Sequence, residues 1–234
     1  AGVQAGTQLF GTDSMSGGTF AFTDANAGTH KTVTISGVTV NDGNGGGNYT
    51  VGYASNTTST ITAAPLTVST GDVTKTYDGT LAAAGSAVVT SGTLYHNASN
   101  GNALDTLSGG TFAFTDANAG AGKTVTTSGV AVNDGNSGGN YTLSYADNTT
   151  STINRALLTF AGTVATKAYD GTTAATLAGY TLTGFAGSET VGAALGSATF
   201  SDKNAGTGKT VAIGGLALVD GTHGGLPANY SVSP

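Results

Sequence analysis

One stretch of the sequence recurs three times, and this recurrence limits what the chain can fold into. In its fullest form the stretch covers residues 109–125 and reads GGTFAFTDANAGAGKTV. Residues 17–28 repeat its first part without a change, and residues 197–211 form a looser copy, SATFSDKNAGTGKTV. Self-similarity at a regular spacing is the sequence signature of a tandem array. The chain is therefore expected to consist of repeated modules.

The repeated stretch itself predicts a β-hairpin. Phe112 and Phe114 are two residues apart, so in a strand their side chains share one face. The Asp-x-Asn-Ala-Gly segment that follows favours a tight turn, and Lys123 opens a second alternating strand. We expect the Phe pairs to lie in the module cores, although strict alternation also allows them to face outward against a loop. These pairs are Phe20 with Phe22 and Phe112 with Phe114.

Composition favours an all-β fold with many short strands and tight turns. Charged residues make up 9% of the chain, against roughly 25% in ordinary globular domains. Thr favours strands, and the 39 Gly favour turns. The net charge of −6 argues against nucleic acid as a partner. No apolar run reaches the roughly 18 residues that a spanning helix needs, so we expect no membrane insertion in this segment.

The repeats divide the chain into three modules. Residues 1–64 form a partial β module that lacks its opening strands, and residues 65–155 form a complete one. Residues 156–234 form a module that lacks its closing strand. Two explanations of the incomplete modules stay open. The chain continues in a longer polypeptide, or neighbouring copies donate the missing strands.

Two further segments recur within the modules. An identical NTTSTI segment stands at residues 56–61 and 148–153 and is expected to form a closing strand. In the segment before it, aromatic or aliphatic residues stand at every second position, as Tyr49, Val51 and Tyr53 do in the first module. Alternating residues of a strand share a face, so these three are expected to be buried together.

A four-residue motif carries a resemblance to a known family. Tyr-Asp-Gly-Thr occurs at residues 77–80 and 169–172, each time after a Thr-Lys pair, and the first module lacks it. The motif resembles the YDG-type repeats, grouped with the mostly bacterial immunoglobulin-like (MBG) modules, of large secreted bacterial adhesins and haemagglutinin-like proteins. The resemblance implies tandem Ig-like β-sandwich modules of about 90 residues, which form an elongated rod without enzymatic activity. It also implies secretion to the bacterial cell surface.

Recurrent aspartates are the candidates for chemistry. Asp42, Asp134 and Asp220 follow the second hairpin strand and are weak calcium candidates, because Asp-Gly-Asn turns can supply oxygen ligands. Each turn offers one carboxylate, however, and an Asp that bonds its own backbone explains the pattern without a metal. The sequence therefore predicts no catalytic residue and no cofactor site, with calcium as the single cofactor to consider.

Lysines recur beside other aspartates, those of the hairpin turn and of the Tyr-Asp-Gly motif. A lysine lies shortly after the hairpin turn of each module, and another precedes each Tyr-Asp-Gly motif. An isopeptide crosslink would need a buried catalytic carboxylate, and the single glutamate, Glu189, does not recur. Salt bridges to the recurrent aspartates, or solvated lysines, are therefore expected. The lysines are Lys31, Lys75, Lys123, Lys167 and Lys209.

These observations favour a structural function. We expect a stalk segment of an extracellular bacterial adhesin or surface filament that mediates cell–cell or biofilm adhesion. Its partners would be neighbouring modules or copies of itself. The alternative is a module that binds glycan, such as an exopolysaccharide. Buried tyrosines would favour the stalk, whereas an exposed row of rings would favour the glycan binder.

Overall fold

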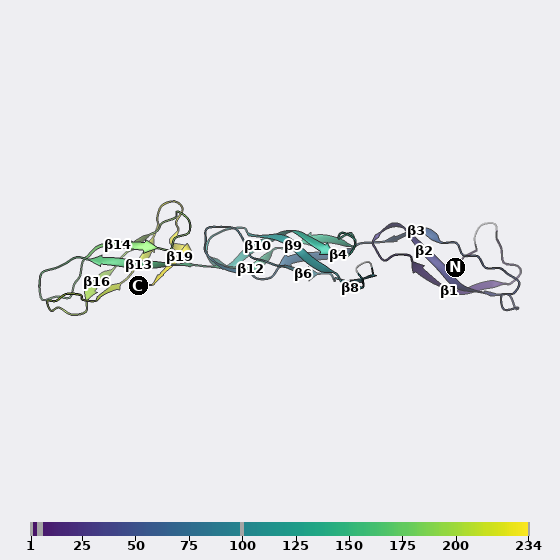
Figure 1. The fold of residues 1–234 in the computed structure, drawn as a ribbon, viewed down its shortest axis with the longest axis horizontal. Helices are drawn as coiled ribbons and strands as arrows, with labels where there is room; N and C mark the ends of the chain where they lie inside the picture. The colour runs from purple at the N-terminus through teal and green to yellow at the C-terminus, as the bar shows by residue number, and fades with distance from the viewer. Residues whose placement is uncertain (1, 4–6, 99–100, 234) are drawn as a thin grey trace. The chain divides into compact units, whose positions relative to one another are not determined.

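The computed structural model describes residues 2–3, 7–98 and 101–233 (Figure 1). Ala1 and Pro234, which begin the first predicted module and end the third, lie outside the described residues. Within the described part of the chain the regular structure is β-strand, with short 3₁₀ turns and no α-helix. The predicted all-β fold is therefore confirmed.

The chain forms two compact units, and each is described by itself. Unit 1 consists of Ala1–Val68, Val89–Gly109 and Gly129–Tyr145. Unit 2 consists of Ser69–Val88, Gly110–Ser128 and Ala146–Pro234. The junction of the first and second predicted modules falls inside unit 1, and that of the second and third falls inside unit 2.

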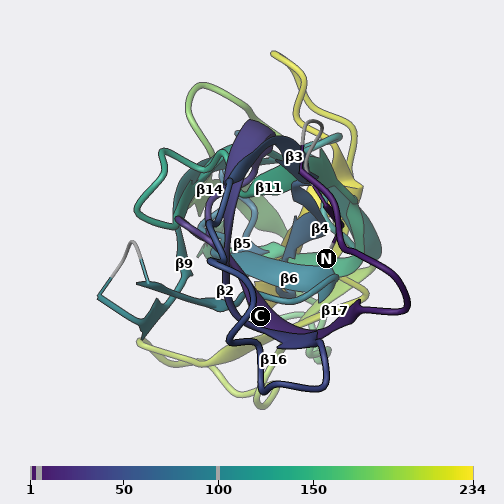
Figure 2. The same ribbon diagram turned by 90° about the vertical axis from the view of Figure 1, so that its right-hand side faces the viewer.

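Unit 1 begins with a three-stranded antiparallel sheet in the order β1-β2-β3. The strands are β1 (Ser14–Phe22), β2 (Gly28–Asn41) and β3 (Asn56–Ile61). A second sheet has the order β11-β4-β6, in which β11 runs parallel to β4 (Figure 2). Its strands are β4 (Ala64–Thr70), β6 (Ala87–Ser91) and β11 (Tyr141–Tyr145). A separate short pair consists of β7 (His96–Asn97) and β8 (Ala103–Leu104).

Unit 2 is built on two larger sheets and two short strand pairs. The sheet orders are β5-β12-β10-β9 and β14-β13-β19, and the pairs are β15 with β18 and β16 with β17. The first sheet contains β5 (Thr74–Thr76), β9 (Thr106–Phe114), β10 (Gly120–Asn133) and β12 (Asn148–Asn154), of which residues 106–109 and 129–133 belong to unit 1. The remaining elements are β13 (Ala156–Val164), β14 (Leu177–Thr183), β15 (Gly192–Ala194), β16 (Ser197–Phe200), β17 (Val211–Gly214), β18 (Ala217–Val219), the 3₁₀ helix η2 (Pro227–Asn229) and β19 (Tyr230–Ser233).

The repeated stretch forms the predicted hairpin in all three copies. The strands before and after the Asp-x-Asn-Ala-Gly turn are neighbours in a sheet, namely β1 with β2, β9 with β10 and β16 with β17. In the first copy the antiparallel register runs from Ser14 opposite Asn41 to Phe22 opposite Val33. The turn residues and the two-residue alternation are therefore sufficient to specify this element.

The predicted burial of the Phe pairs holds in the second module and is wrong in the first. Phe114 is 2% exposed and Phe112 is partly buried. Phe20 and Phe22, in the identical sequence, are 51% and 44% exposed. The difference arises because residues 81–83 bond to β9 in the second module, where the Phe114 N–H donates to the Leu81 carbonyl at 2.8 Å. The given sequence holds no counterpart of this segment beside β1.

The predicted alternating strand in the first module is also wrong. Residues 49–53 form no strand; Tyr49 is half-buried, and Val51 and Tyr53 are exposed. The same residues of the second module form β11, which pairs with β4, the opening strand of that module. Because the first module has no counterpart of β4 in this sequence, residues 49–53 have no strand beside which to extend.

The core of unit 2 joins residues of the second and third modules. Its buried members come from β9, β10, β12, β13, the segment around the first Tyr-Asp-Gly motif, the loop before β15 and strand β19, where Tyr230 is 1% exposed. Partly buried side chains such as Phe112, Phe185 and Leu182 pack against them. The buried members are Val73, Tyr77, Phe114, Val125, Ile153, Ala156, Leu158, Val191 and Tyr230.

Candidate functional site

The hairpin-turn aspartates hold both the turn and a lysine, as predicted. In the second module Asp116 accepts a hydrogen bond from the Asn118 N–H at 2.7 Å and forms an ion pair with Lys123. The Lys123 hydrogen bond is the main reason that the pKa of Asp116 is lowered. These carboxylates are about half exposed, so each ion pair contributes little stability. The other two pairs are Lys31 with Asp24 and Lys209 with Asp202.

The Tyr-Asp-Gly motif forms the same turn in the second and third modules. Asp78 accepts hydrogen bonds from the Thr80 N–H and from Lys75. Gly79 has φ +76, a conformation that side-chain-bearing residues rarely adopt. In the third module Asp170, Thr172 and Lys167 make the same contacts, and Gly171 has φ +78. Lys167 is the main cause that lowers the pKa of Asp170 to about 2.

The tyrosines of the two motifs differ in their surroundings. Tyr77 is 7% exposed, and its hydroxyl donates to Glu189 Oε1 at 2.7 Å. Its ring packs edge-on against Tyr230, with ring centroids 5.4 Å apart. Tyr169 is 66% exposed. Within unit 2, therefore, the first motif reaches into the third module.

A tyrosine–carboxylate pair recurs in all three modules, and the sequence analysis missed it. In each pair the tyrosine hydroxyl donates to the carboxylate and accepts a backbone N–H, which satisfies a buried hydroxyl. In the third module Tyr230 donates to Glu189 Oε2 at 2.7 Å and accepts from the Ala186 N–H at 3.1 Å. The corresponding pairs are Tyr141 with Asp105 at 2.7 Å and Tyr49 with Asp13 at 2.6 Å.

A comparison of the repeats by residue type does not show this recurrence, because the carboxylate is Asp in two modules and Glu in the third. The spacing to the tyrosine also changes, from 36 residues in the first two modules to 41 in the third. Glutamate itself does not recur, but the position of Glu189 does, because Asp13 and Asp105 occupy it in the other two modules. A comparison of acidic positions relative to the Asn-Tyr segment would have indicated the pair.

An asparagine next to two of these tyrosines, Tyr141 and Tyr230, joins one module to the preceding one. In unit 2, Asn229 is 1% exposed and accepts the Ala119 N–H at 2.8 Å, while its amide donates to Asn118 at 3.0 Å. In unit 1, Asn140 does the same, accepting the Ala27 N–H at 2.7 Å. The Asn-Tyr segment of one module thus closes over the hairpin turn of the module before it.

The three calcium candidates occupy different surroundings. Asp134 is fully buried and accepts the N–H groups of Asn136, Gly138 and Asn140 at 2.8 to 3.0 Å. Asp42 makes the equivalent three bonds in the first module. Asp220 is exposed. Among the described residues no cluster of three or more His, Cys, Asp or Glu side chains surrounds any of them. Calcium binding stays a prediction that a calcium titration would test.

The buried Asp134 organises its turn through charge. Burial is the largest influence on its pKa and raises it, but the backbone N–H bonds together outweigh burial, so the pKa of Asp134 is lowered. Asp134→Ala would leave three N–H groups without their acceptor and should cost about 1–3 kcal/mol. Faster hydrogen exchange at the Asn136, Gly138 and Asn140 amides would show the loss. Asp220→Ala is the control, with an expected change within about 0.5 kcal/mol, and equal effects of the two variants would contradict the assigned role.

The buried tyrosines make the fold sensitive to alkali. Burial, and next the hydrogen bond to a carboxylate, raise the pKa of Tyr77 and of Tyr141 from 10.0 to about 12. Between pH 10 and 12 the unfolded chain therefore loses protons that the folded chain keeps. The stability contribution is complete below pH 10 and is lost as the pH rises through this window.

Urea denaturation followed by circular dichroism should show this decline in the free energy of unfolding between pH 10 and 12. A variant with Phe at both positions, Tyr77 and Tyr141, should show a smaller decline because the titrating groups are gone. An unchanged slope in that variant would contradict the assignment. Tyr169→Phe, at an exposed position, is the matched control.

None of the helical turns in the described part of the chain has the length and hydropathy needed to cross a membrane.

Neither a curated protein nor a solved structure matches the chain significantly. The family model of the YDG domain matches residues 1–59, 62–151 and 154–234, which together cover nearly all of the sequence. The chain therefore belongs to the YDG domain family and contains three of its repeats in tandem.

Proposed function

We propose that the chain is a structural stalk segment of a secreted bacterial adhesin or surface filament that mediates cell–cell or biofilm adhesion. In this proposal its modules are Ig-like β-sandwiches that determine how far the stalk extends. Their partners are neighbouring modules or copies of the chain. The observation that carries the proposal is the repeated joint between modules. A chain that transmits tension needs such a joint at every module boundary.

The joint in unit 2 is built from groups that resist separation. Asn229 pairs with two positions of the preceding hairpin turn, Ala119 and Asn118. Glu189 takes one hydroxyl from each module, Tyr77 from the second and Tyr230 from the third, both at 2.7 Å. Buried hydrogen bonds to a charged group are about twice as strong as neutral ones. Separating the modules would break the Tyr77 bond to Glu189 Oε1, whereas the Tyr230 bond to Glu189 Oε2 lies within the third module.

The proposal includes no enzymatic activity. The acidic and hydroxyl groups that recur are engaged in turns, ion pairs and joints. Asp78 and Asp116, for example, each hold a turn and a lysine. The lack of cysteine is consistent with bacterial extracellular modules that fold without disulfides.

Glycan binding is the second candidate, and one observation favours it. Tyr53 and Tyr145, at equivalent positions, are 49% and 44% exposed, so their rings are open to a sugar face. Their hydroxyls accept the N–H groups of Val38 and Val130, which fixes the rings in place. The tyrosines that precede them, Tyr49 and Tyr141, are instead half-buried or buried.

Pulling the two ends of the chain apart in a force microscope tests the stalk. We expect discrete unfolding events, with roughly 300 Å of extended chain released for the central repeat of residues 62–151. Asn229→Ala should lower the force of the event that involves unit 2. Smooth extension without such events would overturn the stalk. Saturable binding of exopolysaccharide that Tyr145→Ala and Tyr53→Ala abolish would instead establish the glycan binder.

A further inference from the structure

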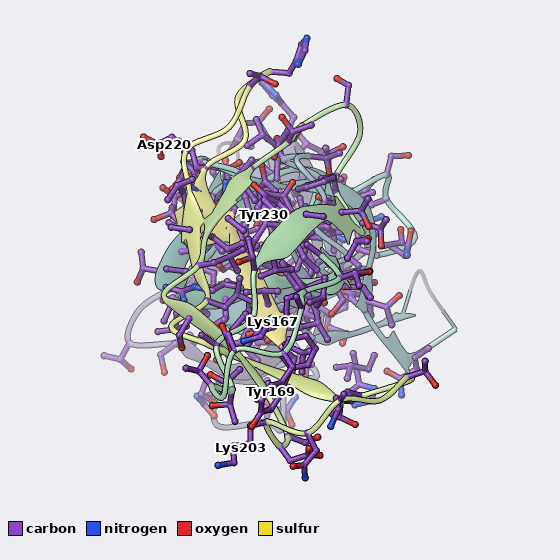
Figure 3. All side chains as sticks on the ribbon, turned by 90° about the vertical axis from the view of Figure 1, so that its left-hand side faces the viewer. Lys167, Tyr169, Lys203, Asp220 and Tyr230 are labelled. Carbon is purple, nitrogen blue, oxygen red and sulfur yellow. The ribbon has the colours of Figure 1, made fainter. Side chains whose placement is uncertain are left out.

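The turn after the second hairpin strand recurs in all three modules, and its copies differ at two positions. It reads Asp-Gly-Asn-Gly-Gly-Gly at residues 42–47 and Asp-Gly-Asn-Ser-Gly-Gly at residues 134–139. The third copy, Asp-Gly-Thr-His-Gly-Gly at residues 220–225, begins with Asp220, which is labelled in Figure 3. The first copy therefore differs from the others in having an asparagine that is followed by glycine.

The backbone N–H that follows this asparagine is free. The other N–H groups between residues 44 and 48 donate to the Asp42 carboxylate or to the Asn44 carbonyl. In the part of the chain that the structure describes, the Gly45 N–H has no acceptor. Gly45 is exposed and has φ +63. Its nitrogen can therefore approach the Asn44 side chain without first breaking a hydrogen bond.

The second copy has the same hydrogen bonds but carries a side chain at the position after the asparagine. The N–H groups of residues 136 and 138–140 donate to Asp134 or to the Asn136 carbonyl. Ser137 is exposed and has φ +55, close to the value of Gly45. A Cβ atom beside the nitrogen hinders its approach to the amide, and glycine has none. The two copies thus share a fold and differ in how easily this nitrogen can react.

We propose that Asn44 is a site of spontaneous deamidation, in which its side-chain amide becomes a carboxylate. The Gly45 nitrogen bonds to Asn44 Cγ and loses its proton to solvent, while Nδ2 leaves as ammonia, so that a five-membered succinimide forms. Water then opens the ring at either carbonyl. Opening at Cγ gives aspartate, whereas opening at the backbone carbonyl gives isoaspartate, in which the chain runs through Cγ. The reaction consumes one water and releases one ammonia.

The modification would change the contacts of a neighbouring asparagine. Asn44 Nδ2 donates to Asn48 Oδ1 at 3.1 Å, and the same bond joins Asn136 to the joint residue Asn140. Deamidation removes this donor and places a second negative charge two residues from Asp42. In isoaspartate the additional backbone carbon also displaces the N–H groups that Asp42 accepts. The modified turn should therefore release the Asn48 side chain.

The test is incubation of the full chain at mildly alkaline pH, followed by digestion after lysine and arginine and by mass spectrometry with fragmentation. Asn44 lies in the peptide of residues 32–75, and Asn136 lies in that of residues 124–155. Asn44 should show the mass change from amide to carboxylate about tenfold faster than Asn136 does. Methyl transfer by an isoaspartyl methyltransferase should label the peptide of Asn44, because the succinimide also opens to isoaspartate.

Two reciprocal variants isolate the effect of the glycine. Gly45→Ser should slow deamidation at Asn44 about tenfold. This variant is expected to fold, because Ser137 has φ +55 at the equivalent position. Ser137→Gly should raise the rate at Asn136 by a similar factor, and it keeps the test independent of the folding of the first variant.

Hydrogen exchange of the aged chain reports the structural effect, which is faster exchange at the Gly46 and Asn48 amides. Three results would overturn the proposal. They are a rate at Asn44 no higher than that at Asn136, a rate at Asn44 that Gly45→Ser leaves unchanged, and a rate at Asn136 that Ser137→Gly leaves unchanged.

Discussion

Replacing Phe114 with alanine should lower the free energy of unfolding of unit 2 by about 3–5 kcal/mol. Phe114 is 2% exposed and belongs to the core that Val125, Ile153 and Tyr77 also form. The substitution removes the aromatic ring from a packed site and leaves a cavity that its neighbours can only partly fill. Because a chain of several modules need not unfold in one step, the measurement is native-state hydrogen exchange of the β12 amides.

The first module supplies a matched control for Phe114. Phe22 stands in the same local sequence but is 44% exposed, so Phe22→Ala should cost about 1 kcal/mol or less. The difference between the two variants measures what the covering segment, residues 81–83, adds to the hairpin. Equal losses would mean that the hairpin alone, rather than its cover, determines the burial energy.

Tyr230→Ala should have a comparable effect, about 3–5 kcal/mol on unit 2. The Tyr230 ring packs edge-on against Tyr77 and Phe185, with centroid distances of 5.4 and 5.7 Å. Its hydroxyl also joins Glu189 to the Ala186 N–H. The variant therefore removes these ring contacts and leaves a partly buried carboxylate oxygen and a partly buried N–H without their partner.

Tyr230→Phe separates the two contributions. It keeps the ring and removes the hydroxyl, so the expected loss is about 1–3 kcal/mol. Tyr169→Ala, at a 66% exposed position, should change the free energy of unfolding by no more than about 0.5 kcal/mol. Hydrogen exchange at the β13 and β19 amides would report all three variants. A loss for Tyr230→Phe as large as that for Tyr230→Ala would assign the whole effect to the hydroxyl.

Local features of the fold were predictable from the sequence because each depends on a few adjacent residues. The Asp-x-Asn-Ala-Gly turn, the Lys123 ion pair with Asp116 and the positive φ of Gly79 all follow from such short-range patterns. The family resemblance also rested on contiguous motifs. These features do not require knowledge of which strands lie next to one another.

Burial and the joints were not predictable in the same way. Phe22 and Phe114 have identical neighbours in sequence, and only the presence of residues 81–83 beside β9 separates an exposed ring from a buried one. The tyrosine–carboxylate pairs span 36 to 41 residues and allow either Asp or Glu. Contacts of this kind depend on the sheet order, which periodicity alone does not determine.

Asn140 couples a turn of its own module to the joint with the preceding module. Its backbone N–H donates to Asp134 and so closes a turn of its own module, while its side chain holds the Ala27 N–H of the preceding module. Opening of the Asp134 turn would therefore also displace the acceptor of the Ala27 N–H, so a disturbance within one module reaches its joint with the module before it.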